Sequence, residues 1–345
     1  MIPSQRRRYR FIKDFLASLA LYSMKNIIIQ DAYGNNIEFS RIIFGGSNVS
    51  FLERKLPSDF LSKCLNYDMF TIDTARVYGK GLSEEMIGEW MQRYHIPRDK
   101  MTIISKCCHP ALAILPRLNR TQAFKDIEAS LKALKVSYVD CLLLHRDDPL
   151  KKPEEIITFM NEIVSRGYAR SIGVSNWKAE RIKKANDFAR DHGMTPFCIA
   201  ESQFSLGTRV KDPWHNGTLS ITGMDQSKER EFYLKEKMPF LCFSALGDGF
   251  FAGKIRHDDM DIKKKLSRTS YSAYYSEHNL EVLKRAEELA AKKNCSVSAI
   301  ALSYCLNQEI EMGVVVSASS EERIVENLKA LEIKLTKEEL DYLTI

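Results

Sequence analysis

Four side chains of complementary chemistry lie at the ends of strand-like runs in this 345-residue chain. Asp73 and Tyr78 lie in FTIDTARVYGKGLSE, Lys106 ends MTIISK and His145 ends YVDCLLLH. A free tyrosine has a pKa of about 10, a nearby ammonium favours its phenolate, and a carboxylate can fix that ammonium in place. We therefore expect Asp73 to hold Lys106, Lys106 to bring the pKa of Tyr78 toward neutrality, and His145 to orient a substrate oxygen. Such a tyrosine suits the reduction of a carbonyl group, which needs a proton as well as a hydride.

The elements that must position these residues follow a strand–helix alternation. NIIIQ and IEFS flank DAYGNN, which predicts an opening β-hairpin. Eight strand-like runs come next: RIIFGG, MFTIDT, MTIISK, YVDCLLLH, ARSIGVS, FCIAES, PFLCFS and GVVVSAS. Helical patterns cover 58–66, 83–93, 121–135, 153–165, 178–191, 226–236, 280–308 (two helices) and 320–331. The alternation predicts a parallel α/β sheet, and the count of eight predicts a (β/α)8 TIM barrel with an N-terminal β-hairpin.

Strand composition and the placement of polar residues both favour the barrel. MFTIDT, YVDCLLLH and PFLCFS are nearly continuous apolar runs, as in parallel strands that are covered on both faces. In such barrels the active site lies at the carboxyl ends of the strands. Six polar residues fall at or just beyond a strand end: Asp73, Lys106, His145, Asn176, Gln203 and Ser244. We expect them to surround one site.

Composition and charge exclude several other classes of protein. Hydrophobic residues make up 44% of the chain and charged residues 28%, and no apolar run is long enough to suggest a stable membrane insertion. The eight cysteines form no CxxC pair, which predicts buried thiols in a cytoplasmic protein. Of the net charge of +6, +4 lies in residues 1–24, so the remainder offers little basic surface for nucleic acid.

The basic segment MIPSQRRRYRFIKDFLASLALYS leaves three interpretations open. It could be an export signal, but Lys13 and Asp14 interrupt its apolar part and no cleavage-like site follows. It could be a short amphipathic helix that lies on a membrane or a partner. The third interpretation is a disordered extension upstream of a working start at Met24. We expect the folded barrel domain to cover residues 25–345.

Seven segments in order resemble the aldo-keto reductase family: DTARVYGKGLSE, ISK, LLLH, IGVSN, ESQFSL, FSALGDGFFAGK and RIVEN. The match runs from about residue 38 to 332, and LHRD followed by DPL is similar to a bacterial branch of that family. The resemblance implies an NADPH-dependent oxidoreductase that reduces an aldehyde or ketone to an alcohol. The hydride would come from the nicotinamide, since side chains cannot supply one, and the proton from Tyr78.

The resemblance also implies which residues bind the cofactor. Ser175, Asn176 and Gln203 match residues that hold the nicotinamide amide, and Phe243 matches an aromatic that stacks on its ring. The complete set of cofactor-binding candidates is Ser47, Ser175, Asn176, Gln203, Phe243, Ser244, Leu246, Asp248, Ser317, Arg323, Glu326 and Asn327. Ser317 stands where relatives that prefer the 2′-phosphate often have lysine, while Arg323 can still bind a phosphate. We expect NADP, with NAD as the alternative.

Other readings of the chain remain. A regulatory or cofactor-sensing protein on the same fold would keep these residues with little turnover, and a Schiff-base enzyme would use Lys106 as a nucleophile. No metal site is expected, because the adjacent Cys107, Cys108 and His109 cannot easily surround one zinc ion. Six aromatic residues in the loops after strands five to seven could line a substrate pocket or pack the loops: Trp177, Trp214, Phe250, Tyr271, Tyr274 and Tyr275. The expected oligomeric state is a monomer or a dimer.

Overall fold

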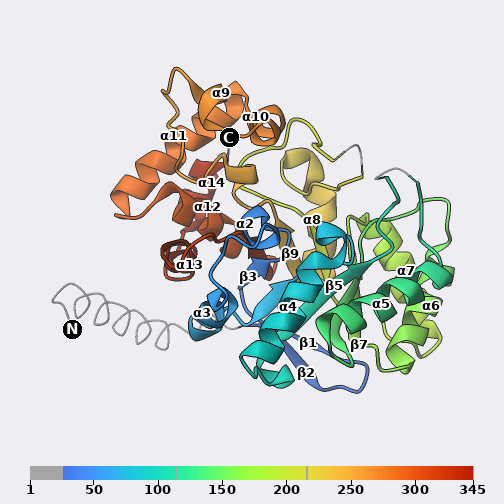
Figure 1. Ribbon diagram of the computed structural model, residues 1–345. Coiled ribbons are helices and arrows are strands. Elements are labelled where there is room, and N and C mark those ends of the chain that lie inside the picture. Colours follow the sequence, from blue (N-terminus) through green and yellow to red (C-terminus); the bar gives the residue numbers. More distant parts are fainter. Residues whose placement is uncertain (1–25, 113–114, 215–216, 345) are drawn as a thin grey trace.

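Eight parallel strands close into a barrel in the computed structural model, which confirms the predicted (β/α)8 architecture (Figure 1). The structure describes residues 26–112, 115–214 and 217–344. The barrel strands are β3 (Ile42–Gly45), β4 (Thr71–Asp73), β5 (Thr102–Cys107), β6 (Val139–Leu144), β7 (Ala169–Ser175), β8 (Ala200–Gln203), β9 (Phe240–Phe243) and β10 (Met312–Val316). Each pairs with the next in sequence, and β10 closes the circle against β3. The interpretations of residues 1–24 lie outside the described residues.

The register of the strands sets which residues share a level of the barrel. Asp73 lies opposite Ile104 of β5, and Lys106 lies opposite Leu143 of β6. On the far side, Glu201 of β8 lies opposite Ser175 of β7. Nearly every strand residue is buried, because one face packs in the barrel and the other packs against the helices.

The predicted hairpin is present and closes one end of the barrel. It consists of β1 (Ile27–Gln30) and β2 (Asn36–Phe39), which are antiparallel. Its four buried apolar side chains join one cluster with residues of the barrel strands: Ile27, Ile29, Ile37 and Phe39 with Ile43, Ile104, Cys141, Leu143, Ile199 and Leu241. The hydroxyl of Thr102, at the start of β5, donates a hydrogen bond to the carbonyl of Glu38. The hairpin therefore covers the amino ends of the strands and leaves their carboxyl ends to form a site.

Helices surround the barrel and connect the strands (Figure 1). The longer ones are α4 (Leu82–Arg93), α5 (Arg120–Leu134), α6 (Pro153–Ser165), α7 (Ala179–Asp191), α8 (Ser227–Glu236), α11 (Glu277–Lys292), α12 (Val297–Leu306) and α13 (Glu321–Leu328). Shorter helices are α2 (Val49–Leu52), α3 (Phe60–Asn66), α9 (Ile262–Lys265), α10 (Arg268–Tyr274) and α14 (Lys337–Leu343). Several start at a side chain that accepts a backbone N–H, among them Asn119 of α5 and Ser320 of α13. Such caps replace the missing hydrogen bonds of the first turn.

The sequence pattern did not predict four of the short helices. One is α2, and two others, α9 and α10, lie between the predicted helical ranges 226–236 and 280–308. Helix α14 was also absent from the expected pattern, although Thr336 and Glu339 form a reciprocal capping box at its start. With only 4 to 7 residues each, these helices carry too few turns for a clear apolar period.

Candidate active site

The barrel brings the four predicted chemical groups together at the carboxyl ends of β4, β5 and β6. The Lys106 ammonium pairs with the Asp73 carboxylate, and both side chains are buried. The same nitrogen lies 3.3 Å from the Tyr78 hydroxyl oxygen, to which it can donate a hydrogen bond. The Tyr78 and His145 rings meet edge to face at a centroid distance of 5.7 Å. The four groups therefore face a common point.

A tight turn after β4 positions Tyr78. Gly79, Lys80 and Gly81 all have positive φ, so the chain reverses within a few residues. Arg76 fixes this turn: its guanidinium pairs with the buried Glu84 carboxylate at 2.6 Å and donates to the Lys80 carbonyl. A Cβ at Gly81 would lie 1.5 Å from the Arg76 guanidinium, so this packing requires glycine.

The charges around Lys106 strongly affect its own titration and that of Tyr78. Burial acts to lower the pKa of Lys106, but Asp73, Glu201 and Tyr78 outweigh it and raise this pKa, so the ammonium stays charged. Burial raises the pKa of Tyr78 above its usual value; Lys106 opposes that shift, while Asp73 and Glu201 add to it. Lys106 thus acts on the Tyr78 pKa in the expected direction, but the groups around the site raise that pKa by more than Lys106 lowers it. The physical reason is that burial and two carboxylates outweigh one ammonium.

His145 is a neutral imidazole in this setting. Burial, followed by the nearby Lys106, His109 and Arg146, lowers the pKa of His145 well below its usual range. His109 packs edge to face on it at a centroid distance of 4.6 Å. The Nδ1 atom of His145 is buried and has no hydrogen-bond partner among the described residues. A neutral ring of this kind can donate a hydrogen bond to a substrate oxygen without adding charge.

A fifth group that the sequence analysis did not assign is Glu201. Its Oε1 atom lies 3.4 Å from the Lys106 nitrogen, and its side chain is buried. The signal in the sequence was a carboxylate inside the apolar run FCIAES, two residues before Gln203. An acidic residue in a strand that is otherwise buried on both faces must have a partner.

The predicted nicotinamide-binding residues lie at the ends of β7 and β8, next to the four chemical groups. Asn176, at a φ of 62°, donates to the His145 carbonyl and to Ser175 Oγ, and its Oδ1 accepts from the Leu219 backbone. Gln203 is fully buried; its amide nitrogen donates to Ser205, and its oxygen accepts from Ser220. The amides of Gln203 and Asn176 are thus both already bonded within the chain.

The turn after β9 holds a second group of candidates. Ser244 and Asp248 both have positive φ, and the Ser244 hydroxyl donates to Asp248 Oδ1 at 2.7 Å. Phe243 is half-buried and meets the Trp214 ring edge to face at 5.9 Å. Leu246 is also half-buried in this turn. These candidates therefore lie in one short segment at the end of β9.

The remaining cofactor candidates lie beyond β10 and β3. Ser317 and Arg323 are exposed, as is Ser47 after β3. Glu326 accepts from the Ser296 hydroxyl and from Lys329, so its carboxylate is already bonded within the chain. Asn327 is buried on α13.

Unpartnered buried polar atoms test whether this rim fits a bound dinucleotide. Within the described part of the chain, they include His145 Nδ1, Glu201 Oε2, Asp248 Oδ2 and Asn327 Nδ2. His145 follows β6, Glu201 lies within β8, Asp248 lies in the turn after β9 and Asn327 lies on α13. Buried polar groups usually have partners, so the unpartnered atoms of His145 and Asp248, beside the candidate residues, fit a bound polar ligand such as a dinucleotide.

The aromatic residues in the loops divide between the two roles left open. Trp177, Phe250 and Tyr274 are almost fully buried, so they pack the loops. Trp214 contacts Phe243 and so borders the candidate cofactor site. Tyr271 and Tyr275 stack on each other at 4.5 Å, and Tyr275 is exposed.

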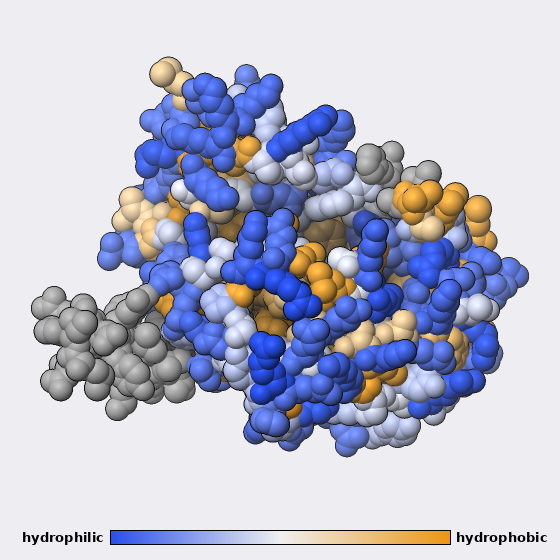
Figure 2. Space-filling model, viewed as in Figure 1, coloured by the Kyte–Doolittle hydropathy of each residue, from blue (hydrophilic) through white to orange (hydrophobic). Residues whose placement is uncertain are grey.

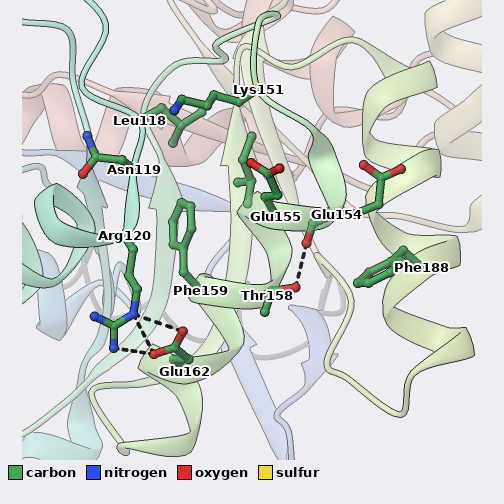
Figure 3. A pocket seen from close by; sticks show the side chains of 11 residues that line it. Leu118, Asn119, Arg120, Lys151, Glu154, Glu155, Thr158, Phe159, Glu162 and Phe188 are labelled. Atoms are coloured by element: carbon green, nitrogen blue, oxygen red, sulfur yellow. Dashed lines mark hydrogen bonds and ion pairs between the residues drawn. The ribbon is translucent and has the colours of Figure 1, made fainter.

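A groove elsewhere on the surface is not part of this site. It has a volume of about 460 Å³ and lies between the starts of α5 and α6 and the side of α7 (Figure 3). Its apolar lining includes Phe159 and Phe188, and the Arg120–Glu162 ion pair crosses its edge. In Figure 2 the hydrophobic residues of the visible face form separate groups among hydrophilic ones. Among the described residues, no helix has the length and apolar character of a membrane span.

Comparisons with known proteins agree with this arrangement. Residues 41–345 match the model of the aldo/keto reductase family. An aldo-keto reductase of Alternaria alternata is 26% identical over 337 residues, which cover 88% of this chain and 87% of the relative. The versiconal hemiacetal acetate reductase of Aspergillus parasiticus is 27% identical over 319 residues, 84% of this chain and 86% of the relative. A crystal structure of a thermostable aldo-keto reductase bound to the inhibitor epalrestat superposes with a TM-score of 0.66 at 23% identity, covering 92% of this chain and 98% of that one.

Proposed function

The chain belongs to the aldo/keto reductase family, and on that premise we propose that it reduces an aldehyde or ketone to an alcohol with NADPH. The observation that carries the proposal is the contact between the Tyr78 hydroxyl and the Lys106 ammonium, which is itself paired with Asp73. An oxidoreductase that acts on small carbonyl compounds is the activity that the family supports. We propose in addition that NADPH is the cofactor and that Tyr78 is the proton donor.

The proposed reaction balances with the groups of the site. A bound reduced nicotinamide would supply the hydride that the carbonyl carbon takes up, and would itself be oxidised. As the C=O double bond becomes single, the substrate oxygen takes the proton of the Tyr78 hydroxyl. The Lys106 ammonium at 3.3 Å stabilises the phenolate that remains, until a proton from solvent restores the tyrosine. His145 donates a hydrogen bond to the same oxygen and fixes its direction, a geometric role that a neutral ring can fill.

The candidate cofactor residues form two groups in this proposal. Ser175 and Asn176 would hold the nicotinamide amide, and Phe243 would stack on its ring. Ser244, Leu246 and Asp248 would lie in the turn that approaches the pyrophosphate, and Ser47, just after β3, is a further candidate. Arg323 would bind the 2′-phosphate from α13, near Ser317, Glu326 and Asn327. To bind the nicotinamide amide, Gln203 and Asn176 would exchange hydrogen bonds that their amides now make within the chain.

The charged state of Lys106 speaks against a Schiff-base enzyme. A lysine nucleophile must be neutral, but the ion pair with Asp73 holds this one as an ammonium. Borohydride treatment with an aldehyde should accordingly leave no covalent adduct on Lys106. A cofactor-sensing protein on the same fold would retain NADPH binding without turnover, so turnover separates that alternative from the enzyme.

The deciding experiment is a turnover assay with an aromatic aldehyde and NADPH. We expect the nicotinamide absorbance to fall and the alcohol to appear in equal amounts. The matched control is Tyr78→Phe, which keeps the ring but lacks the proton. If the native chain binds NADPH yet forms no more alcohol than this control with any of a panel of aldehydes and ketones, the sensing role replaces the enzyme.

We also propose a cytoplasmic location. All eight cysteines lie among the described residues and are free thiols, as expected in a reducing compartment. A monomer or a dimer remains the expected state, and size-exclusion chromatography with light scattering distinguishes the two.

A further inference from the structure

Glu201 occupies a position inside the barrel that the proposed reaction does not use. Only 2% of its surface is exposed, and its Oε1 atom lies 3.4 Å from the Lys106 nitrogen. The negative charge of the Asp73 carboxylate, which binds the same ammonium, also acts on it. Its Oε2 atom is buried and has no partner among the described residues. Two carboxyl groups thus share one ammonium in a place that excludes water.

The other charged and titratable groups that face Glu201 come from the surrounding elements. Tyr78 follows β4, Arg146 follows β6, and Cys242 lies on the neighbouring β9. Arg146 brings a positive charge, but its guanidinium bonds to the Gly217 carbonyl, and it forms no ion pair with a described residue. With both carboxylates ionised, the Asp73–Lys106–Glu201 group would therefore carry one uncompensated negative charge.

A proton on one carboxyl group removes this excess, and the geometry indicates which group holds it. Asp73 makes the shorter contact with the Lys106 ammonium, so its ionised form is the better stabilised of the two. Glu201 makes the longer contact, so its ionised form is the less stabilised of the two and the proton resides on Glu201. Burial, followed by the negative charge of Asp73, raises the pKa of Glu201 to about 8, against the opposing effect of Lys106.

We propose that Glu201 is a protonated positioning residue whose ionisation switches the reductase off. This inference rests on the proposed function. With Glu201 protonated, the Asp73–Lys106 pair is neutral, and the ammonium is free to stabilise the Tyr78 phenolate. When Glu201 loses its proton, the added negative charge disfavours that phenolate and competes with Tyr78 for the same ammonium. The separations from the Lys106 nitrogen are nearly equal, 3.4 Å to Glu201 and 3.3 Å to Tyr78.

The first test needs neither cofactor nor turnover. A carboxyl group whose pKa is higher in the folded than in the unfolded chain binds its proton more tightly in the folded state. Its stabilising contribution is present at low pH and is lost as the pH rises from about 4.5 to about 8. The melting temperature of Glu201→Gln should therefore rise relative to that of the native chain across this window. Glu85→Gln, which removes an exposed carboxylate from α4, is the control and should follow the native curve.

The second test is the pH profile of kcat for reduction at saturating NADPH. The native enzyme should lose about tenfold in kcat per pH unit above the transition, as expected when only the protonated form is active. In Glu201→Gln this fall in kcat should begin at a pH more than one unit higher. Glu201→Asp can still ionise, so its kcat should still fall at high pH.

The two tests fail in distinguishable ways. A difference in melting temperature between the native chain and Glu201→Gln that does not vary with pH shows that Glu201 holds no proton in the folded state, and the proposal is wrong whether or not the protein reduces aldehydes. A melting difference that varies as expected, with an unmoved kcat profile, shows that the proton does not control the reaction and overturns the switch. If the native chain has no turnover, the proposed function fails and the switch fails with it, while the melting curves still report the proton on Glu201.

Discussion

The Lys106 ammonium lies 3.3 Å from the Tyr78 hydroxyl oxygen while it pairs with Asp73. One nitrogen thus connects the charged core of the barrel with the group proposed to donate the proton. Because both Asp73 and Lys106 are buried, this connection is little screened by solvent. The consequences are measurable in catalysis, in stability and in cofactor binding.

Tyr78→Phe should abolish most of the turnover and leave NADPH binding intact. The change removes the transferable proton but keeps the ring that packs against His145. General acid catalysis contributes about 10²–10⁴-fold, so kcat with any accepted aldehyde should fall by about that factor. The measurements are kcat at saturating NADPH and the dissociation constant of NADPH. A kcat close to the native value would show that another group supplies the proton.

Lys106→Met should lower kcat as strongly, and it should also destabilise the fold. Removing one partner of a buried ion pair costs about 3–5 kcal/mol, because the other charge is left without compensation. Asp73 and Glu201 would then need protons to remain buried. Their folded-state pKa values would rise, so the loss of stability should be smallest at low pH and grow as the pH increases. Denaturant unfolding at several pH values measures this, and a loss that shrinks with rising pH contradicts it.

Asp73→Asn should lower both kcat and the stability of the fold less than Lys106→Met does. Glu201 remains 3.4 Å from the Lys106 nitrogen and can ionise to take the place of the lost carboxylate. We therefore expect a smaller fall in kcat and a smaller loss of unfolding free energy. The double variant Asp73→Asn with Glu201→Gln should lose more than the two single changes together, since it removes both acids. Strict additivity would show that the carboxyl groups do not substitute for each other.

NADPH should bind more tightly than NADH, by a moderate factor. A single hydrogen-bonded contact with a charged group contributes about 1.5–3 kcal/mol, which corresponds to about tenfold to a hundredfold in affinity. Arg323 is the expected contact, and the exposed Ser317 offers no charge. Fluorescence titration with both cofactors gives the ratio. Arg323→Ala should remove the preference for NADPH, and Ser317→Lys should increase this preference. Equal affinities in the native chain would show that Arg323 does not bind the phosphate.

Deletion of residues 1–23 should leave stability, cofactor binding and turnover unchanged, because the first described strand begins at Ile27. The contrasting change is Ile29→Asp in that strand. It places a carboxylate in the apolar cluster that closes the barrel, and it should cost at least about 3 kcal/mol of unfolding free energy. Thermal unfolding of the two variants separates the roles of the segments. A large loss on deletion would mean that the first 23 residues pack on the barrel, and membrane binding that disappears with them would favour the amphipathic helix.

The sequence alone determined the barrel and four of the groups at its centre. Parallel strands that are buried on both faces need continuous apolar runs, so MFTIDT and YVDCLLLH stand out from the helices around them. Since the carboxyl ends of such strands meet on one side of a barrel, Asp73, Lys106 and His145 were expected to converge. Local pattern and topology carry this information, and both can be recognised without coordinates.

Only the tertiary structure decided which side chains from different strands come into contact inside the barrel. In the sequence, Glu201 is a single acidic residue in an apolar strand. Its contact with Lys106, 95 positions earlier in the chain, depends on the register of β8 and on the closure of the barrel. The same holds for Gln203, whose amide is used by Ser205 and Ser220 of its own loop. The pKa direction of Tyr78 also depended on the structure, because burial is a property of the whole fold and outweighed the ammonium beside it.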